Sequence, residues 1–132
     1  MSVRIEHDLI GNKDIPKEAY YGIQTARAKE NFDASGVSLS NFTTFITSLA
    51  KVKKATALAN YELNELSEEK KNVICQACDE IIAGKLHEQF VVDMIQGGAG
   101  TSTNMNTNEV IANRALEILG HEKGEYKYLH PN

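Results

Sequence analysis

The sequence predicts a mainly α-helical domain that carries a small N-terminal β-hairpin. Three observations lead to this prediction. Apolar residues recur with the 3.6-residue helical period in three long segments, short extended segments are confined to the first 16 residues, and only two prolines occur. Because 132 residues are enough chain for one hydrophobic core, we expect a single domain over residues 1–132.

The N-terminal quarter is expected to hold the hairpin and short helical pieces. Residues 3–16 predict two extended segments with Gly11-Asn12 as the turn. Pro16 suits the first position of a short helix through Tyr21. Residues 25–32 predict another one or two helical turns, and the loop that follows is rich in Asp, Ser and Gly.

Three major helices are expected after this loop. They span residues 42–66, 67–84 and about 101–119, and glycines end the second and the third. Ser40 or Asn41 would cap the first of them. Three such amphipathic helices carry more apolar surface than they would bury against one another. The sequence therefore also predicts a docking partner.

Composition excludes several classes of protein. The formal net charge is −4 and no basic run extends beyond Lys51, Lys53 and Lys54, so we expect no nucleic-acid partner and a solvated lysine face. No apolar segment is long enough to span a bilayer, and the N-terminus lacks the apolar core of a signal peptide. We therefore expect a cytoplasmic protein without a membrane partner.

Cys75 and Cys78 form a CxxC pair, a spacing used by redox and zinc proteins. The pair falls well inside a predicted helix, whereas redox pairs use a helix N-terminus to lower the pKa of the thiol. No second CxxC or histidine pair completes a zinc set. We interpret the cysteines as two buried thiols on one helix face, and expect no metal.

The most informative segment is Gln96–Val110, QGGAGTSTNMNTNEV. Glycines run directly into a predicted helix, and seven hydroxyl or amide side chains fall in the eight residues 101–108. Glycine permits close approach to the backbone, and a helix N-terminus offers unpaired N–H groups and the positive end of its dipole. No lysine or arginine lies between Gln96 and Asn113, so neutral donors would hold any anion here. That favours a small carboxylate over a polyphosphate.

A plain helix cap is the alternative interpretation of this segment, since Ser, Thr and Asn are ordinary cap residues. The segment lacks the Gly-Lys-Ser/Thr of a P-loop and the GxGxxG of a dinucleotide site. The excess of polar side chains favours a ligand site, because one cap needs one of them. Asn104 and Asn108 share a helical stripe with Ile111 and Ala115, which predicts inward-facing amides.

These residues resemble the first signature of the aspartase/fumarase superfamily, and the resemblance covers the whole chain. Fumarase relatives are expected to have GSGTQSNMN at this place, so Gly98-Ala99-Gly100-Thr101-Ser102 is closer to the aspartate ammonia-lyase branch. The other matching blocks are RIEHDLIG, IPKEAYYGIQTARAKENF, VKKA with ALAN, ACDEI, QFVVDMI and KGEY.

The resemblance implies the N-terminal domain of a longer, homotetrameric lyase that converts L-aspartate reversibly to fumarate and ammonia without a cofactor. It implies that Thr101 binds the substrate β-carboxylate, that the loop Ala99–Ser102, with Gly100, shapes the pocket, and that Asn104 holds this loop. The proton-abstracting serine of the family lies in a downstream GSSxMPxKxN loop that is missing here. We therefore expect no catalytic residue in these 132 residues, and no activity from them alone.

Other assignments stay open at this point. The fumarase-like tripeptide at the end of the chain resembles part of a peripheral carboxylate site, which would place His130 and Asn132 in a second site. A fumarate hydratase N-terminal domain is one alternative, and a non-catalytic helical interaction domain is another. Arg27 either contacts substrate or pairs with a nearby acid.

Overall fold

The computed structural model describes residues 2–132 and confirms a mainly α-helical fold with an N-terminal hairpin. Within this range the chain forms four α-helices, one more than the three major helices expected, together with two strands and three short 3₁₀ turns. The elements are β1 (Val3–Asp8), β2 (Gly11–Pro16), α1 (Ile23–Asn31), η1 (Leu39–Asn41), α2 (Thr43–Glu62), α3 (Glu68–Ile82), η2 (His87–Gln89), η3 (Gly98–Gly100) and α4 (Thr101–Ile118).

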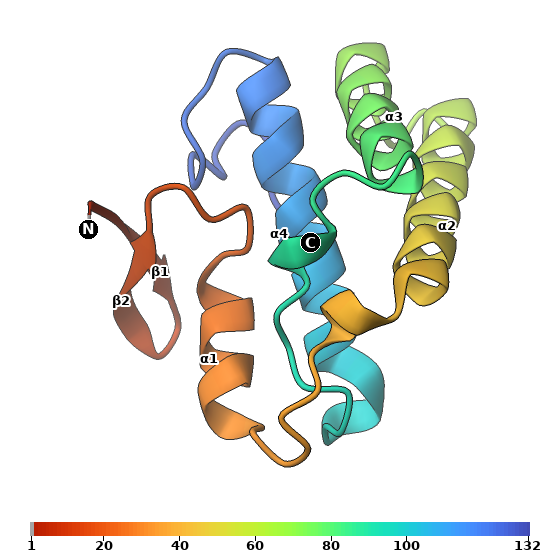
Figure 1. Ribbon diagram of the computed structural model, residues 1–132. Helices are drawn as coiled ribbons and strands as arrows, with labels where there is room; N and C mark the ends of the chain where they lie inside the picture. The colour runs from red at the N-terminus through yellow and green to blue at the C-terminus, as the bar shows by residue number, and fades with distance from the viewer. Residues whose placement is uncertain (1) are drawn as a thin grey trace.

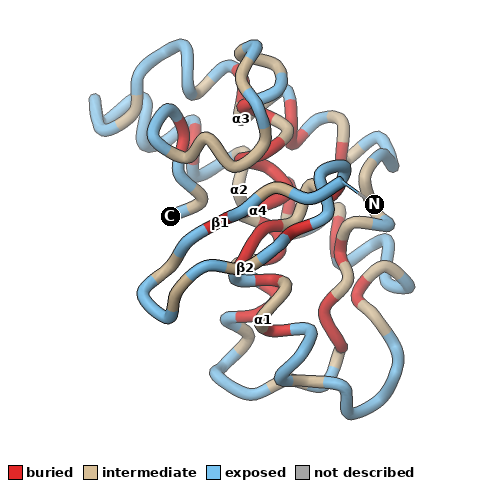
Figure 2. Tube along the Cα trace, turned by 90° about the vertical axis from the view of Figure 1, so that its left-hand side faces the viewer, coloured by how far each residue is buried: buried red, intermediate tan, exposed pale blue. Residues whose placement is uncertain are grey.

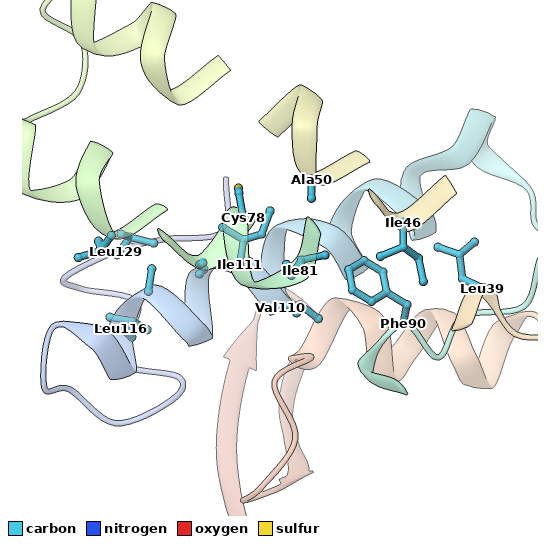
Figure 3. Packing of buried hydrophobic residues seen from close by; sticks show 14 of the residues in the cluster. Leu39, Ile46, Ala50, Cys78, Ile81, Phe90, Val110, Ile111, Leu116 and Leu129 are labelled. Carbon is cyan, nitrogen blue, oxygen red and sulfur yellow. The ribbon is translucent and has the colours of Figure 1, made fainter. Parts of the chain in front are cut away.

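Helix α4 is the central element (Figure 1). It packs against α1 on one side and against α3 on the other, and α2 pairs with α3 at the edge of the molecule. The hairpin lies beside α1. Buried residues gather along α4 in the middle of the molecule, whereas the hairpin tip is exposed (Figure 2). The fully buried core side chains come from several elements and include Ile46, Ile81, Phe90, Val110 and Leu116 (Figure 3).

The hairpin turn lies at Leu9-Ile10 and not at Gly11-Asn12, so that prediction is wrong. The strands pair in antiparallel register from Val3 opposite Pro16 to Asp8 opposite Gly11. The Asp8 side chain decides the turn, because its Oδ1 accepts the N–H groups of Ile10 at 2.9 Å and Gly11 at 3.2 Å.

Pro16 ends β2 and does not open a helix, so the short helix expected through Tyr21 is absent from the described chain. The expected turns over residues 25–32 are confirmed as α1, which begins slightly earlier, at Ile23. No side chain of the preceding residue caps α1. Its N–H groups are bound by carboxylates from distant elements, described below.

Local capping signals succeed for α3 and fail for α2. Ser67 Oγ accepts the N–H of Lys70 at 3.3 Å, as expected for the cap of α3. Helix α2 begins at Thr43, after a 3₁₀ turn, without a side-chain cap from Ser40 or Asn41. Within residues 2–132, no helix combines the length and the apolar character that a bilayer crossing requires.

The two cysteines lie inside α3 as free thiols. Cys78 is fully buried and Cys75 is half-buried, so the interpretation as structural thiols fits Cys78 best. Burial raises the pKa of Cys78 to about 12 and also raises that of Cys75, which keeps both thiols protonated at neutral pH.

Candidate functional site

The glycine-rich segment forms a left-handed bend at the start of α4. Three consecutive residues have positive φ: 70° at Gly98, 53° at Ala99 and 86° at Gly100. A residue other than glycine in this region costs roughly 1–2 kcal/mol, so the surrounding contacts must hold Ala99 in place. The chain then enters an 18-residue helix at Thr101.

Thr101 is exposed, and its polar groups are used within the bend. Both its N–H and its hydroxyl donate to the carbonyl of Gly98, the hydroxyl at 2.7 Å. The hydroxyl is therefore not a free donor in this arrangement. Rotation about one side-chain bond of an exposed threonine would turn it towards a ligand.

Gln96 braces the bend from its N-terminal side. Its side-chain oxygen accepts the N–H of Thr103 at 2.9 Å, and its side-chain nitrogen donates to the carbonyl of Asp93 at 2.9 Å. Ser102, between the bend and this contact, is buried. One N–H of the first turn of α4 is thus capped by a residue five positions before that helix.

Most of the polar excess in α4 faces protein and not a ligand. Asn106 is fully buried, accepts the N–H of Val92 at 3.4 Å and donates to the carbonyl of Gln89 at 2.9 Å. Thr107 donates to the carbonyl of Thr103 at 2.9 Å. These contacts satisfy buried groups and tie α4 to the segment before the bend.

The predicted inward orientation of Asn104 is wrong, and Asn108 is only half-buried. Asn104 is exposed, and its side-chain oxygen accepts Lys53 Nζ at 2.6 Å. The prediction took the stripe through Ile111 as the buried face of this helix, but α4 is buried on several sides. The buried polar stripe runs instead through Thr103, Asn106, Thr107 and Asn113.

Lys53 is a residue near the bend that the sequence analysis placed on the solvated face. It is half-buried, and burial lowers its pKa. The signal was present in the sequence, because Lys53 follows Ile46 by seven residues and precedes Ala57 by four, both of which are buried. It brings a positive charge to Asn104, on the first turn of α4.

Thr101 lines an open cleft of about 660 Å³ that the hairpin tip, α1, α4 and the C-terminal tail enclose. The tail contributes His130 and Asn132, so both predicted sites meet at one cleft. Ala99, Gly100, Ser102 and Asn104 are not among the described residues that line it. The lining residues are His7, Asp8, Leu9, Ile10, Ile23, Gln24, Thr101, Met105, Glu109, Tyr126, His130, Pro131 and Asn132.

The charge of this cleft is unfavourable for a dicarboxylate. Asp8 and Glu109 line it, and neither Lys nor Arg is among its described lining residues. Arg27 pairs with Asp8 at 2.8 Å and 2.9 Å, which confirms the acid-pairing alternative for this arginine and lowers the pKa of Asp8 to about 2. A dianion bound here would need a positive charge from outside the lining.

The tail residues of the second predicted site contact each other. His130 is exposed, and its Nδ1 accepts the backbone N–H of Asn132 at 3.1 Å. The two residues also border a second groove of about 370 Å³, whose other walls include Lys53, Lys70 and Asn108. The tail thus separates two hollows.

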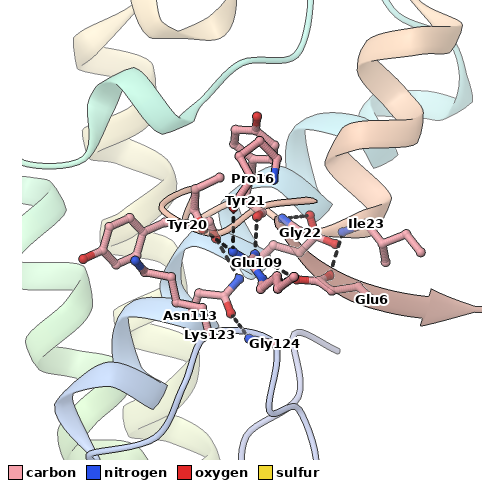
Figure 4. A network of polar contacts seen from close by, with 12 residues as sticks. Glu6, Pro16, Tyr20, Tyr21, Gly22, Ile23, Glu109, Asn113, Lys123 and Gly124 are labelled. Atoms are coloured by element: carbon pink, nitrogen blue, oxygen red, sulfur yellow. Dashed lines mark hydrogen bonds and ion pairs between the residues drawn. The ribbon is translucent and has the colours of Figure 1, made fainter. Parts of the chain in front are cut away.

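A buried polar network beside the cleft was not predicted from the sequence (Figure 4). Glu109, 1% exposed, accepts the N–H groups of Gly22 at 2.9 Å, Gln24 at 2.8 Å and Thr25 at 3.0 Å, and also the Thr25 hydroxyl. Burial raises the pKa of Glu109, although these bonds oppose that shift. Glu6 accepts the remaining early N–H, that of Ile23, at 2.8 Å.

Two distant carboxylates therefore cap α1 in place of a local residue. Tyr126 donates to Glu6 and Asn113 donates to Tyr126, which extends the network to the tail. A Cβ at Gly22 would lie 2.4 Å from the Tyr126 oxygen and 2.7 Å from that of Glu6, so this position requires glycine.

Comparison with known proteins identifies the family. A family profile described as lyase matches residues 11–132. The chain belongs to the lyase family. Two curated lyase relatives, the aspartate ammonia-lyases of Pseudomonas aeruginosa and Helicobacter pylori strain J99, are 63% and 61% identical to it over 131 and 130 residues. That of Escherichia coli K12 is 52% identical over 132 residues.

Each alignment covers 98–99% of this chain and 28% of the relative, so the chain spans little more than a quarter of the length of these lyases. This confirms the resemblance to an N-terminal part of an aspartase/fumarase superfamily member.

Solved structures agree. A Brucella melitensis protein described as fumarate lyase:delta crystallin, bound to cobalt, superposes with a TM-score of 0.98 at 58% identity over 99% of this chain and 28% of its own. A class II fumarase from Schistosoma mansoni gives 0.86 at 34% identity over 94% of this chain and 26% of its own.

Proposed function

We propose that these residues act as the N-terminal part of an aspartate ammonia-lyase, which deaminates L-aspartate reversibly to fumarate and ammonia without an organic cofactor. The support is the 52–63% identity to three relatives that carry this name. The whole enzyme is proposed to be a cytoplasmic homotetramer, and we propose no nucleic-acid or membrane partner.

The bend before α4 is proposed to bind the β-carboxylate of the substrate, with Thr101 as its side-chain donor. One observation carries this proposal: a bend of three left-handed residues delivers an exposed threonine, at the N-terminus of a long helix, to an open cleft. Helix N-termini favour anions. Ala99, Gly100 and Ser102 shape the bend, and Asn104 holds Lys53 beside it.

The remaining parts of the active site are proposed to come from other polypeptide. Asp8 and Glu109 leave the cleft without a cation of its own, so a dicarboxylate needs positive charge from elsewhere. The family resemblance implies a downstream serine as the base and an active site shared by three subunits. The 132 residues alone are therefore proposed to bind substrate weakly and to lack catalysis.

His130 and Asn132 are proposed as part of a second, peripheral carboxylate site. They lie at the cleft and the neighbouring groove, and Lys53 and Lys70 on the wall of that groove supply positive charge. Binding of succinate, followed by the amide shifts of these residues in an NMR titration, tests this assignment. His130→Ala should remove the shifts at the tail and leave those at Thr101.

The main test uses a chimera in which these residues replace the corresponding part of the Helicobacter pylori relative. Thr101→Val removes the hydroxyl but keeps the shape of the side chain. It should lower kcat/KM by a factor that corresponds to a loss of about 2–4 kcal/mol of transition-state stabilisation, as expected for one oxyanion donor. Thr101→Ser keeps a donor and is the matched control. An unchanged kcat/KM in Thr101→Val would exclude this residue from substrate stabilisation.

Fumarate hydratase activity is the second candidate function, favoured by the TM-score of 0.86 with a class II fumarase. Its 34% identity is lower than that of the aspartate ammonia-lyases. Parallel assays of the chimera and of the native full-length protein with aspartate and with malate separate the two. Turnover of malate but not aspartate by the native protein would establish the second function.

A further inference from the structure

The first turn of α4 is capped across the bend and not by its own N-cap residue. The N-cap position is Gly100, which has no side chain to accept a hydrogen bond. Gln96 takes over this role, because its side-chain oxygen accepts the N–H of Thr103 at 2.9 Å. An ordinary cap fixes only the end of its helix. This cap also closes residues 96–103 into a loop that contains the whole bend.

The other end of the Gln96 amide is anchored to a buried residue. Its nitrogen donates to the backbone carbonyl of Asp93 at 2.9 Å, and Asp93 is only 6% exposed. The carboxylate of Asp93 accepts the N–H groups of Ser35 and Gly36, each at 2.9 Å. It also accepts the N–H of Ile95 at 2.7 Å. Gln96 therefore joins the start of α4, through Asp93, to the loop that follows α1.

The backbone of the bend depends on such support. Ala99 has a φ of 53°, in the left-handed region, between Gly98 and Gly100 at 70° and 86°. A residue other than glycine keeps this conformation only where its surroundings impose it. Without the two hydrogen bonds of Gln96, residues 97–102 gain access to other conformations, and Thr101 moves with them.

Gln96 supports Thr101 without lining the cleft itself. Thr101 lines the cleft, and its N–H and hydroxyl both bond to the carbonyl of Gly98, inside the loop that Gln96 closes. Gln96 is half-buried and is not among the described residues that line the cleft. It is therefore placed to act on a ligand through Thr101 and not by direct contact.

We infer that Gln96 is a positioning residue for the proposed lyase reaction, and that its two hydrogen bonds hold Thr101 where the substrate carboxylate arrives. This inference rests on the proposed function, in which Thr101 binds the β-carboxylate. A displacement of about 1 Å in a positioned group can cost about a hundredfold in rate. An amide suits this place, since an ionised carboxylate accepts but cannot donate to the Asp93 carbonyl, and a methionine of similar length does neither.

A double-mutant cycle in the native full-length protein tests the inference. Gln96→Met removes both hydrogen bonds and should lower kcat/KM for aspartate about tenfold or more. In a Thr101→Val background the same substitution should change kcat/KM by less than about twofold, because the residue through which Gln96 acts is gone. A merely structural loss would be equal in the two backgrounds.

Gln89 offers a matched control away from the bend. It is also half-buried, and its side-chain oxygen accepts a backbone N–H, that of Tyr20, at 2.8 Å. Gln89→Met should lower the Tm about as much as Gln96→Met, yet leave kcat/KM within about twofold of the parent value.

Gln96→Glu separates the two hydrogen bonds. The carboxylate keeps the bond to Thr103 and loses the one to Asp93, so kcat/KM should fall below that of the parent protein. The ratio of the two kcat/KM values should recover as the pH is lowered, because a protonated carboxyl group donates again. A ratio that is independent of pH would contradict the anchoring by Asp93.

Hydrogen exchange gives a measurement that does not depend on turnover. Mass spectrometry of the peptide that covers residues 97–103 should show faster exchange in Gln96→Met than in the parent protein, and no change in Gln89→Met. Equal exchange in the parent and in Gln96→Met overturns the inference. An equal loss of kcat/KM with and without Thr101→Val overturns it as well.

The proposed function fails in a different way. Turnover of aspartate, with an equal effect of Gln96→Met in the two backgrounds, contradicts the positioning role and leaves the proposed function standing. Turnover of malate but not aspartate contradicts the proposed function. The same cycle is then run with malate, and an effect of Gln96→Met that disappears in Thr101→Val supports the positioning role.

Discussion

Replacement of Glu109 by glutamine tests the capping of α1 by a distant carboxylate. The two carboxylate oxygens accept three backbone N–H groups and one hydroxyl from residues 22–25. Glutamine keeps one acceptor. With its oxygen towards Gly22 and Thr25, its NH₂ group faces the N–H of Gln24, and one buried bond becomes a contact between two donors.

The expected cost follows from these contacts. One hydrogen bond to a charged acceptor contributes about 1.5–3 kcal/mol, and a negative charge at a helix N-terminus about 0.3–1 kcal/mol. Burial opposes the charge, as the raised pKa of Glu109 shows, so its removal offsets part of the loss. We expect a net destabilisation of about 2 kcal/mol, or roughly 6–10 °C in Tm for a domain of this size.

Thermal unfolding followed by circular dichroism measures this loss in the 132-residue chain. Glu62→Gln, at the exposed end of α2, is the matched control and should change stability by less than about 0.5 kcal/mol. Hydrogen exchange of the amides of residues 22–25 should accelerate in Glu109→Gln. A Tm equal to that of the parent protein would refute the capping role.

Three further predictions concern stability and reactivity. Gly22→Ala should cost about 2 kcal/mol or more in urea unfolding, because its Cβ meets buried oxygens, whereas Gly97→Ala, with only 3.4 Å contacts, should be nearly neutral. Arg27 lowers the pKa of Asp8 from 3.8 to about 2, and the Ser35 hydroxyl lowers that of Asp93 by the same amount. The stability that these two carboxylates give the folded state is therefore present above about pH 4 and lost towards about pH 2. Tm measured from pH 5 to 2 should fall less in the double asparagine variant. Cys78 should resist a thiol reagent at pH 7.5 until the protein unfolds, because burial raises its pKa to about 12.

The elements predicted correctly from the sequence are those whose signals are local. Helix α3 has a capping serine at Ser67 and a regular apolar period, and the structure agrees with both. The hairpin turn was placed two residues late although its signal is also local: Asp8 binds the N–H groups of Ile10 and Gly11, whereas the prediction followed the Gly11-Asn12 pair. The helix predicted from Pro16 failed for a different reason. The start of α1 at Ile23 depends on the carboxylates of Glu6 and Glu109, which are distant in the sequence and give no local signal.

The sequence indicated which segment carries the candidate site, but not which side chains of that segment line the cleft. Thr101 lines a cleft, whereas Asn104 and Asn108, the amides expected to face inward, do not line it. A helix enclosed by α1 and α3 buries more than one face, so periodicity alone could not separate Asn104 from Asn106. Thr101 and His130 line the same cleft, and no signal in the sequence places them together.

Contacts from the segment before α4 and from the residues that follow α1 hold the bend. The Gln96 side chain accepts the N–H of Thr103 and donates to the backbone carbonyl of Asp93. The carboxylate of Asp93 in turn accepts hydrogen bonds from the loop after α1. The Phe32 ring lies against Gly97, because a Cβ added to Gly97 would be 3.4 Å from this ring. These contacts fix the backbone of the bend, whereas the Thr101 hydroxyl must leave the carbonyl of Gly98 before it can bind a ligand, which lowers its contribution to binding. On the proposed function, this domain supplies shape and neutral donors, and the rest of the enzyme must supply the base and most of the positive charge.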